Sequence, residues 1–319
     1  MTVRIPTLLA AVLAAGFAAP AFASSCWTPT LASADNGYGL PASSPRLARL
    51  RGALDAAESL LRADPGLSAV DGFRLQARRR FGRDEQHARR DTATLWLRFH
   101  APDTWAGEGC TVDQGRADYF NQHAIELVFN DVAPLLRASG ATGDDGEPLL
   151  VTLDPERLAR FRETGLLLNV GEGVRAFRAD GRPVLLPFTV EAHLALWERR
   201  LEALVAAPGG EAFAPQLEAL RGHRDSLSQA AASAQVRQPG HDPAQLWSYA
   251  PAGDADSVPV YQVDPELLKP VTDPSAVSLL TISYYAHADD ERLGPVLSEW
   301  VAGFSPAQAA RLFAAGGVR

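Results

Sequence analysis

Two short segments alternate between apolar and polar side chains, and this alternation constrains the fold more than any other feature of the sequence. In residues 73–81 (FRLQARRRF) and 93–99 (ATLWLRF), apolar side chains recur at every second position. A period of two places them on one face of a β-strand. The polar stretch 82–91 is long for a hairpin connection but still joins antiparallel neighbours. We therefore predict a hairpin with one buried and one polar face, and we expect Arg79, which breaks the apolar row, at a strand end or a bulge.

Helical spacing precedes this hairpin and returns later in the chain. Apolar residues from Leu47 to Leu61 follow a 3.6-residue period between a Ser-Pro start and an Asp-Pro-Gly stop, which predicts a helix. The residues around Asp180-Gly181 predict a second hairpin turn. The remaining candidates are strands at 124–129, 149–153, 166–170, 174–178, 184–189, 258–263 and 277–285, and helices at 190–204, 211–235, 291–303 and 307–315.

Strands that come in clusters, followed by helices in clusters, are typical of an α+β fold. The order favours a mixed or antiparallel sheet with helices packed on one side over a doubly wound sheet. It also allows two sub-lobes, residues 46–140 and 148–319.

The first 23 residues have the form of a secretory signal peptide. Arg4 precedes an apolar stretch, and Ala21-Phe22-Ala23 has the small-x-small pattern that a signal peptidase recognises. A membrane anchor is the alternative, but proline and glycine interrupt the apolar stretch. We therefore expect cleavage after Ala23, an extended polar lead-in over residues 24–45, a globular region over residues 46–319, and a periplasmic or secreted protein with no transmembrane span.

Cys26 and Cys110 are the two cysteines of the chain. Because oxidising compartments favour pairing, we predict a disulfide between them. Two unpaired buried thiols are one alternative. Lipid attachment at Cys26 is another, but such a signal needs a large aliphatic residue three places earlier, where this chain has Ala23.

Charge is distributed unevenly along the chain, whose formal net charge is −8. Residues 46–100 carry 12 arginines against 7 acidic residues, whereas residues 101–319 carry 17 basic against 30 acidic residues. All basic residues except Lys269 are arginines, which indicates a compositional bias, so their abundance alone does not indicate a polyanionic partner.

The polar face of the predicted hairpin is the strongest candidate for a binding site. Guanidinium groups bind phosphate and carboxylate, and an aromatic ring among them adds stacking. We predict a site for an anionic surface ligand or a protein partner, and we expect no nucleic acid in an exported protein. The alternative is a solvated face whose charges protect an open sheet. The anion-binding candidates are Arg74, Arg78, Arg80, Trp96 and Arg98.

Paired carboxylates are the basis of an alternative function. Two acids that folding brings together can hydrolyse a glycosidic bond without any fixed spacing in the sequence. The catalytic candidates are Glu108, Asp113 and Asp118, which lie near Trp105 and Tyr119. Ordinary surface acids beside core aromatics are the other interpretation of this segment.

The remaining chemistry-bearing motifs are missing from the sequence. The seven histidines show neither His-x-His nor His-Glu-x-x-His spacing, and no nucleophile elbow or phosphate-binding glycine loop is present. We therefore expect no metal and no cofactor. The sequence favours an exported binding or interaction component over an enzyme, with a glycan-directed extracytoplasmic hydrolase as the alternative.

Overall fold

A computed structural model describes most of the chain beyond the leader. The described residues are 26–32, 41, 43–84, 90–107, 109–116, 123–135, 147–152, 166–169, 172–238, 247–250, 254, 257–286 and 291–317. The predicted signal peptide, residues 1–23, lies outside them.

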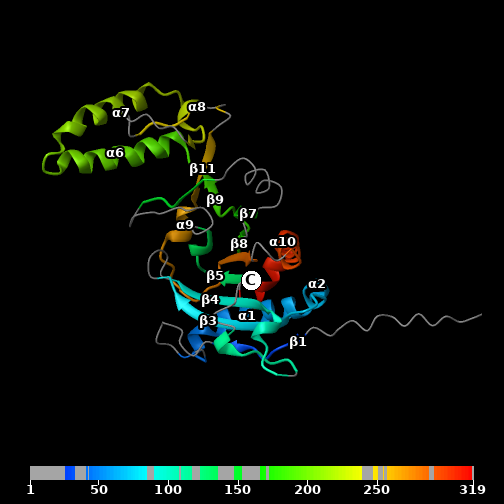
Figure 1. Ribbon diagram of the computed structural model, residues 1–319. Coiled ribbons are helices and arrows are strands. Elements are labelled where there is room, and N and C mark those ends of the chain that lie inside the picture. Colours follow the sequence, from blue (N-terminus) through cyan, green and yellow to red (C-terminus); the bar gives the residue numbers. More distant parts are fainter. Residues whose placement is uncertain are drawn as a thin grey trace, which may run out of the picture.

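A large mixed sheet forms the body of the protein (Figure 1). Two short strands near the start of the chain, β1 (Cys26–Trp27) and β2 (Leu31–Ala32), run parallel to β3 (Arg74–Arg83). The other neighbouring strands of this sheet are antiparallel. This architecture confirms the α+β prediction. In spatial order the strands are β1 (Cys26–Trp27), β3 (Arg74–Arg83), β4 (Asp91–His100), β5 (Ala124–Phe129), β12 (Leu279–Tyr285), β8 (Glu172–Arg178) and β7 (Leu166–Asn169), and β2 (Leu31–Ala32) also pairs with β3.

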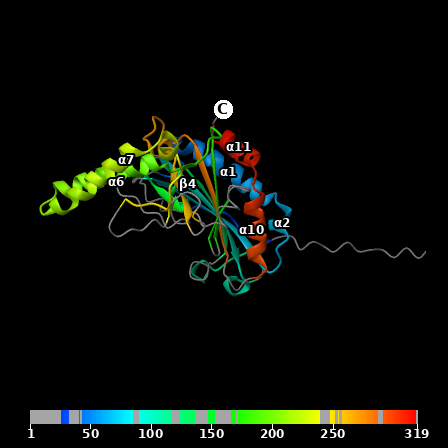
Figure 2. The same ribbon diagram turned by 90° about the horizontal axis from the view of Figure 1, so that it is seen from above.

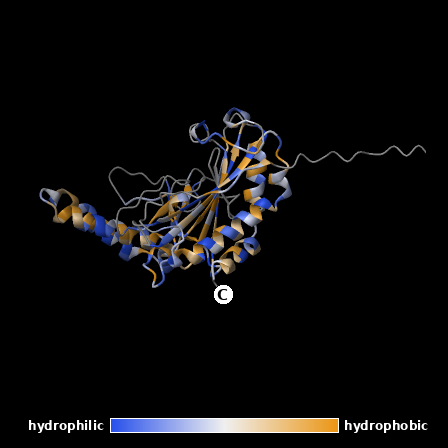
Figure 3. Ribbon diagram, turned by 90° about the horizontal axis from the view of Figure 1, so that it is seen from below, coloured by the Kyte–Doolittle hydropathy of each residue, from blue (hydrophilic) through white to orange (hydrophobic). Residues whose placement is uncertain are grey.

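Helices cover one face of this sheet, as predicted. The principal helices there are α1 (Ala48–Arg62), α10 (Leu293–Gly303) and α11 (Pro306–Ala315), and the short α2 (Pro65–Ser68) lies beside them (Figure 2). Their apolar sides pack on every second residue of β3, β4, β5 and β12, so a single apolar cluster fills the space between helices and sheet. In Figure 3 these helices carry apolar and polar residues on different sides, as a half-buried helix requires.

A smaller antiparallel sheet forms a second unit. It contains β6 (Leu150–Thr152), β9 (Leu185–Pro187), β10 (Arg237–Gln238) and β11 (Val258–Val263). The helices α6 (Val190–Ala206) and α7 (Ala214–Ser226) pair as a hairpin that extends away from the large sheet (Figure 1). Two shorter helices, α8 (Gln229–Ala232) and α9 (Pro265–Leu268), complete the unit. An apolar cluster joins the two sheets, with Val174 and Leu279 from the large one and Val151 and Val263 from the smaller one.

The large sheet takes strands from both sides of residue 140 in the sequence. Strands β8 and β12 follow that residue, yet both belong to the large sheet, where β12 pairs with β5 and β8 pairs with β12. The predicted hairpin around Asp180-Gly181 is wrong, because β8 pairs with β12 and β7, whereas β9 pairs with β11. The turn forms, with the Gly181 N–H bonded to the Arg178 carbonyl at 3.1 Å, but the chain passes there from one sheet to the other.

Arg79 lies in the middle of β3, not at a strand end or bulge, which corrects the expectation for this residue. It shares the helix-covered face, where its guanidinium donates to Glu58 Oε2 of α1 at 3.0 and 2.7 Å. Burial raises the pKa of Glu58, but hydrogen bonds from Thr30, Arg79 and Arg62 outweigh burial and leave that pKa below its ordinary value. A charge on the apolar face is therefore tolerated because a partner on α1 neutralises it.

Candidate functional site

The outer face of β3, β4 and β5 is polar, and strand register aligns its side chains in rows. Arg78 is opposite Trp96, and Trp96 is opposite Glu126. Successive residues of a strand point to opposite faces, so the residues two places along, Arg80 and Arg98, share this face. We call this surface the polar face and define it as Arg78, Arg80, Thr94, Trp96, Arg98 and Glu126.

The polar face is accessible to solvent along most of its length. Arg80 is exposed, and Arg78, Trp96 and Arg98 are half-buried. Four of the five predicted anion-binding residues therefore lie together on one partly exposed surface. The fifth, Arg74, lies on the same face but has a different environment.

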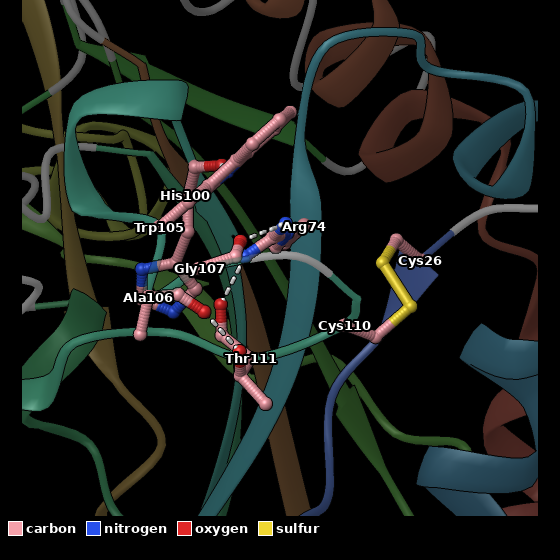
Figure 4. Close-up of a disulfide and its surroundings, with 8 residues drawn as sticks. All are labelled: Cys26, Arg74, His100, Trp105, Ala106, Gly107, Cys110 and Thr111. Atoms are coloured by element: carbon pink, nitrogen blue, oxygen red, sulfur yellow. Dashed lines mark hydrogen bonds between the residues drawn. A yellow bond between two sulfur atoms is a disulfide. The ribbon is translucent and has the colours of Figure 1, made fainter.

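Arg74 is buried beneath the loop of residues 101–116 (Figure 4). Its guanidinium donates to the Thr111 carbonyl and, at 3.1 Å, to the Gly107 carbonyl, and it stacks 4.2 Å from the ring centroid of Trp105. Trp105 in turn donates from its indole nitrogen to the His100 carbonyl at 2.9 Å. Because these contacts direct the guanidinium into the loop, Arg74 is not part of the accessible surface formed by the other four residues.

The predicted disulfide is present and holds the same loop from its other side. Cys26 of β1 is in register with Arg74 of β3, and it is bonded to Cys110, with the two Cα atoms 5.2 Å apart (Figure 4). Residues 26–27 and 31–32 of the lead-in thus pair with β3 at the edge of the large sheet. Thr28 strengthens this attachment, since its N–H donates to the Leu75 carbonyl at 2.8 Å.

Glu126 is a charged residue of this surface that the sequence analysis did not predict. Trp96 Nε1 donates to Glu126 Oε1 at 3.0 Å, and Ser283 Oγ of β12 donates to Oε2 at 3.2 Å. Tyr285, two residues further along β12 on the same face, is 44 % exposed. Alternation within residues 124–129 places Glu126 on the side opposite Ile125, Leu127 and Phe129, but it does not reveal that β5 lies beside β4.

One of the three predicted catalytic carboxylates, Asp113, lies among the described residues. Glu108 and Asp118 lie outside the described part of the chain. The Asp113 carboxylate caps the start of a helical turn, where Oδ1 accepts the N–H groups of Gly115 and Arg116 at 3.0 and 3.3 Å. This geometry gives no specific support to the hydrolase alternative.

The described residues contain neither a metal-binding cluster nor a membrane-spanning helix. There, no three His, Cys, Asp or Glu side chains are placed so that they could hold a metal ion. No helix in that part of the chain has the length and apolar character needed to cross a bilayer. Comparison with known proteins gives no match to a family model, a curated protein or a solved structure.

Proposed function

We propose that this chain is an exported binding protein that recognises an anionic ligand on the polar face. The observation that carries the proposal is the register of β3 and β4, which sets Arg78 directly opposite Trp96 with Arg80 and Arg98 on the same face. Guanidinium groups recognise carboxylate, sulfate or phosphate with paired hydrogen bonds, and the indole adds a surface for stacking.

Two other arginines of β3 are directed away from the polar-face residues. Arg79 pairs with an acid of the helical layer, and Arg74 binds loop carbonyls. Arg78, Arg80 and Arg98 lie on the same face as the half-exposed Trp96. A cluster of cations around an aromatic ring attracts anions more strongly than separate surface charges do.

The exported location rests on two features of the chain. The leader has the charge, apolar stretch and cleavage pattern of a signal peptide. The Cys26–Cys110 disulfide is compatible with an oxidising compartment, where such bonds persist. Mass analysis of the protein from fractionated cells tests both, because an uncleaved cytosolic chain with reduced thiols would overturn this part of the proposal.

Retention on heparin-agarose tests the binding proposal. We expect the Arg78→Glu/Arg80→Glu variant to elute at much lower salt than the wild-type protein, because electrostatic binding weakens steeply with each lost contact. Arg311→Glu is the matched control, since Arg311 is an exposed residue of α11 on the opposite side of the sheet. Equal elution of the double variant and the wild-type protein, with unchanged circular dichroism, would refute the proposal.

A further inference from the structure

Residues 247–250 contact the base of the α6–α7 hairpin through one histidine on each helix. His193 of α6 is 4 % exposed, and its Nε2 lies 2.9 Å from the Trp247 carbonyl oxygen. His223 of α7 stacks on the Trp247 ring with 5.1 Å between centroids, and its Nε2 lies 3.0 Å from the Tyr249 hydroxyl. We call His193, His223, Trp247 and Tyr249 the aromatic clasp.

The same segment is tied to the smaller sheet. The Ala250 N–H donates to the carbonyl of Arg237 in β10 at 3.0 Å. Trp247 is 5 % exposed and belongs to an apolar cluster that the hairpin shares with Val236 and Val260. The clasp therefore lies between the smaller sheet and the hairpin that extends from it (Figure 1).

His193 takes up a proton at a cost in this environment. A carbonyl oxygen only accepts, so Nε2 carries the hydrogen and a second proton must enter at Nδ1. The rings of Phe188, Trp197 and Tyr249 surround the imidazole, with centroids 5.8 to 6.5 Å away. Burial is the largest influence and lowers the pKa of His193. The helix dipole acts in the same direction, because His193 is the fourth residue of α6.

The other charged and titratable groups that face His193 do not remove this cost. Arg200 of α6 lowers the pKa of His193 further, and its Nε donates to Glu147 Oε1 at 2.8 Å. The bond to the Trp247 carbonyl raises that pKa, but burial outweighs it. Burial also raises the pKa of Tyr249, so its phenol stays neutral in mild acid. A charged His193 is therefore accommodated best when the segment moves away and water reaches the ring.

We propose that the aromatic clasp is a pH-sensitive attachment, which holds residues 247–250 on the α6–α7 hairpin when His193 is neutral and releases them when it is charged. Release uncovers Trp247 and frees α7 from the segment. The start of α6 stays attached, because the Val190 N–H donates to the Ala234 carbonyl at 2.9 Å. The clasp shares no residue with the polar face, so its response to pH does not depend on what that face binds.

Hydrogen exchange at the Ala250 amide measures release, because this N–H is bonded to Arg237 while the segment is in place. A released His193 has the ordinary histidine pKa of 6.5, whereas the enclosed ring binds a proton less readily. The closed form is therefore fully favoured above pH 6.5 and loses ground below it. From pH 7.5 to pH 5.5 the opening equilibrium should rise by up to about tenfold, after correction for intrinsic exchange.

Three substitutions separate the groups involved. His193→Gln keeps a hydrogen-bond donor but carries no charge in acid, so it should remove the dependence on pH. His223→Gln loses the stack on Trp247 and the bond to Tyr249, so it should increase opening at both pH values and keep their ratio. His123→Gln is the matched control, since His123 contacts Phe73 of the large sheet, and it should change neither rate.

The Ala179 N–H is the reference amide, because it donates to the Ser278 carbonyl beside the large sheet at 3.0 Å. A wild-type ratio below twofold at Ala250 would overturn the proposal without any variant. Persistence of the full ratio in His193→Gln would show that a different group senses the pH. Equal acceleration at Ala179 and Ala250 would mean that acid unfolds the whole chain, and local release would be excluded.

Discussion

Replacement of Asn130 tests how the ends of β4, β5 and β12 are joined in the large sheet. Asn130 directly follows β5, is 2 % exposed and has a φ of 64°, in the left-handed region. Its amide nitrogen donates to the carbonyls of Asp91 and Ala276 at 3.1 and 2.9 Å. Its amide oxygen accepts the N–H groups of Ser278 and Leu279 at 2.9 and 3.4 Å. One side chain thus satisfies buried backbone groups at the start of β4 and just before β12.

The expected cost follows from these contacts. Asn130→Ala removes three well-formed hydrogen bonds, each worth about 1 kcal/mol net, from buried partners. It also forces alanine into the left-handed region, which adds about 1 kcal/mol. We therefore expect the free energy of unfolding to fall by about 4 kcal/mol. Asn130→Gly loses the same bonds but accepts the positive φ, so its loss should be about 1 kcal/mol smaller.

Urea denaturation followed by far-ultraviolet circular dichroism measures these differences, provided that the denaturant slope is unchanged. Asn130→Asp supplies a shape-matched third variant. At neutral pH its carboxylate faces two carbonyl oxygens, so it should be at least as unstable as Asn130→Ala and should recover part of its stability in acid. An alanine variant within 1 kcal/mol of the wild-type protein, or a glycine variant less stable than the alanine variant, would refute this reasoning.

Three further predictions concern stability. Glu58→Gln should lower the free energy of unfolding by about 2 kcal/mol at pH 7. Because the folded protein holds the pKa of Glu58 below its ordinary value, this contribution is complete above the ordinary carboxyl pKa and is lost as the pH falls through the lowered pKa. Urea midpoints from pH 7 to pH 3 should therefore converge, and a constant gap would contradict this. Replacing both Cys26 and Cys110 by Ser should cost roughly 4 to 5 kcal/mol by the chain-entropy model, since the bond closes a loop of 84 residues; an unchanged urea midpoint would exclude that role. Burial lowers the pKa of His193, so stability should be complete above the ordinary histidine pKa of 6.5 and decline as the pH falls below it. Melting temperatures of His193→Gln should lose this dependence between pH 7.5 and 5.5, and an unaltered slope would assign it to another group.

Most of the secondary structure could be predicted from local patterns, because the spacing of apolar residues within one segment reflects the repeat of a single helix or strand. The alternation in residues 73–81 and 93–99 identified β3 and β4, and helical spacing identified α1. The predicted helix over residues 190–204 corresponds to α6, which begins where the Thr189 side chain accepts the Ala192 N–H at 3.2 Å. The helix predicted over residues 211–235 is divided instead, because Ser228 begins α8 with a cap of its own.

Pairing between distant strands could not be predicted in the same way. The turn at Asp180-Gly181 suggested a hairpin, yet the two strands belong to different sheets. Local turn chemistry fixes the direction of the chain over a few residues, whereas partner choice depends on which apolar faces can be buried together. The candidate site shows the same limit, since Glu126 becomes part of it only because β5 lies between β4 and β12.

Sequence alone determined the alternating strands, the polar face with its arginines and Trp96, and the two cysteines that pair. Each depends on residue type and spacing within one segment, or on there being only two thiols to join. Tertiary structure decided that Arg74 donates to carbonyls of the loop and that Arg79 pairs with Glu58 of α1. It also decided that Glu126 accepts hydrogen bonds from donors on two neighbouring strands. These roles depend on which groups long-range packing brings within hydrogen-bonding distance, and no local pattern contains that information.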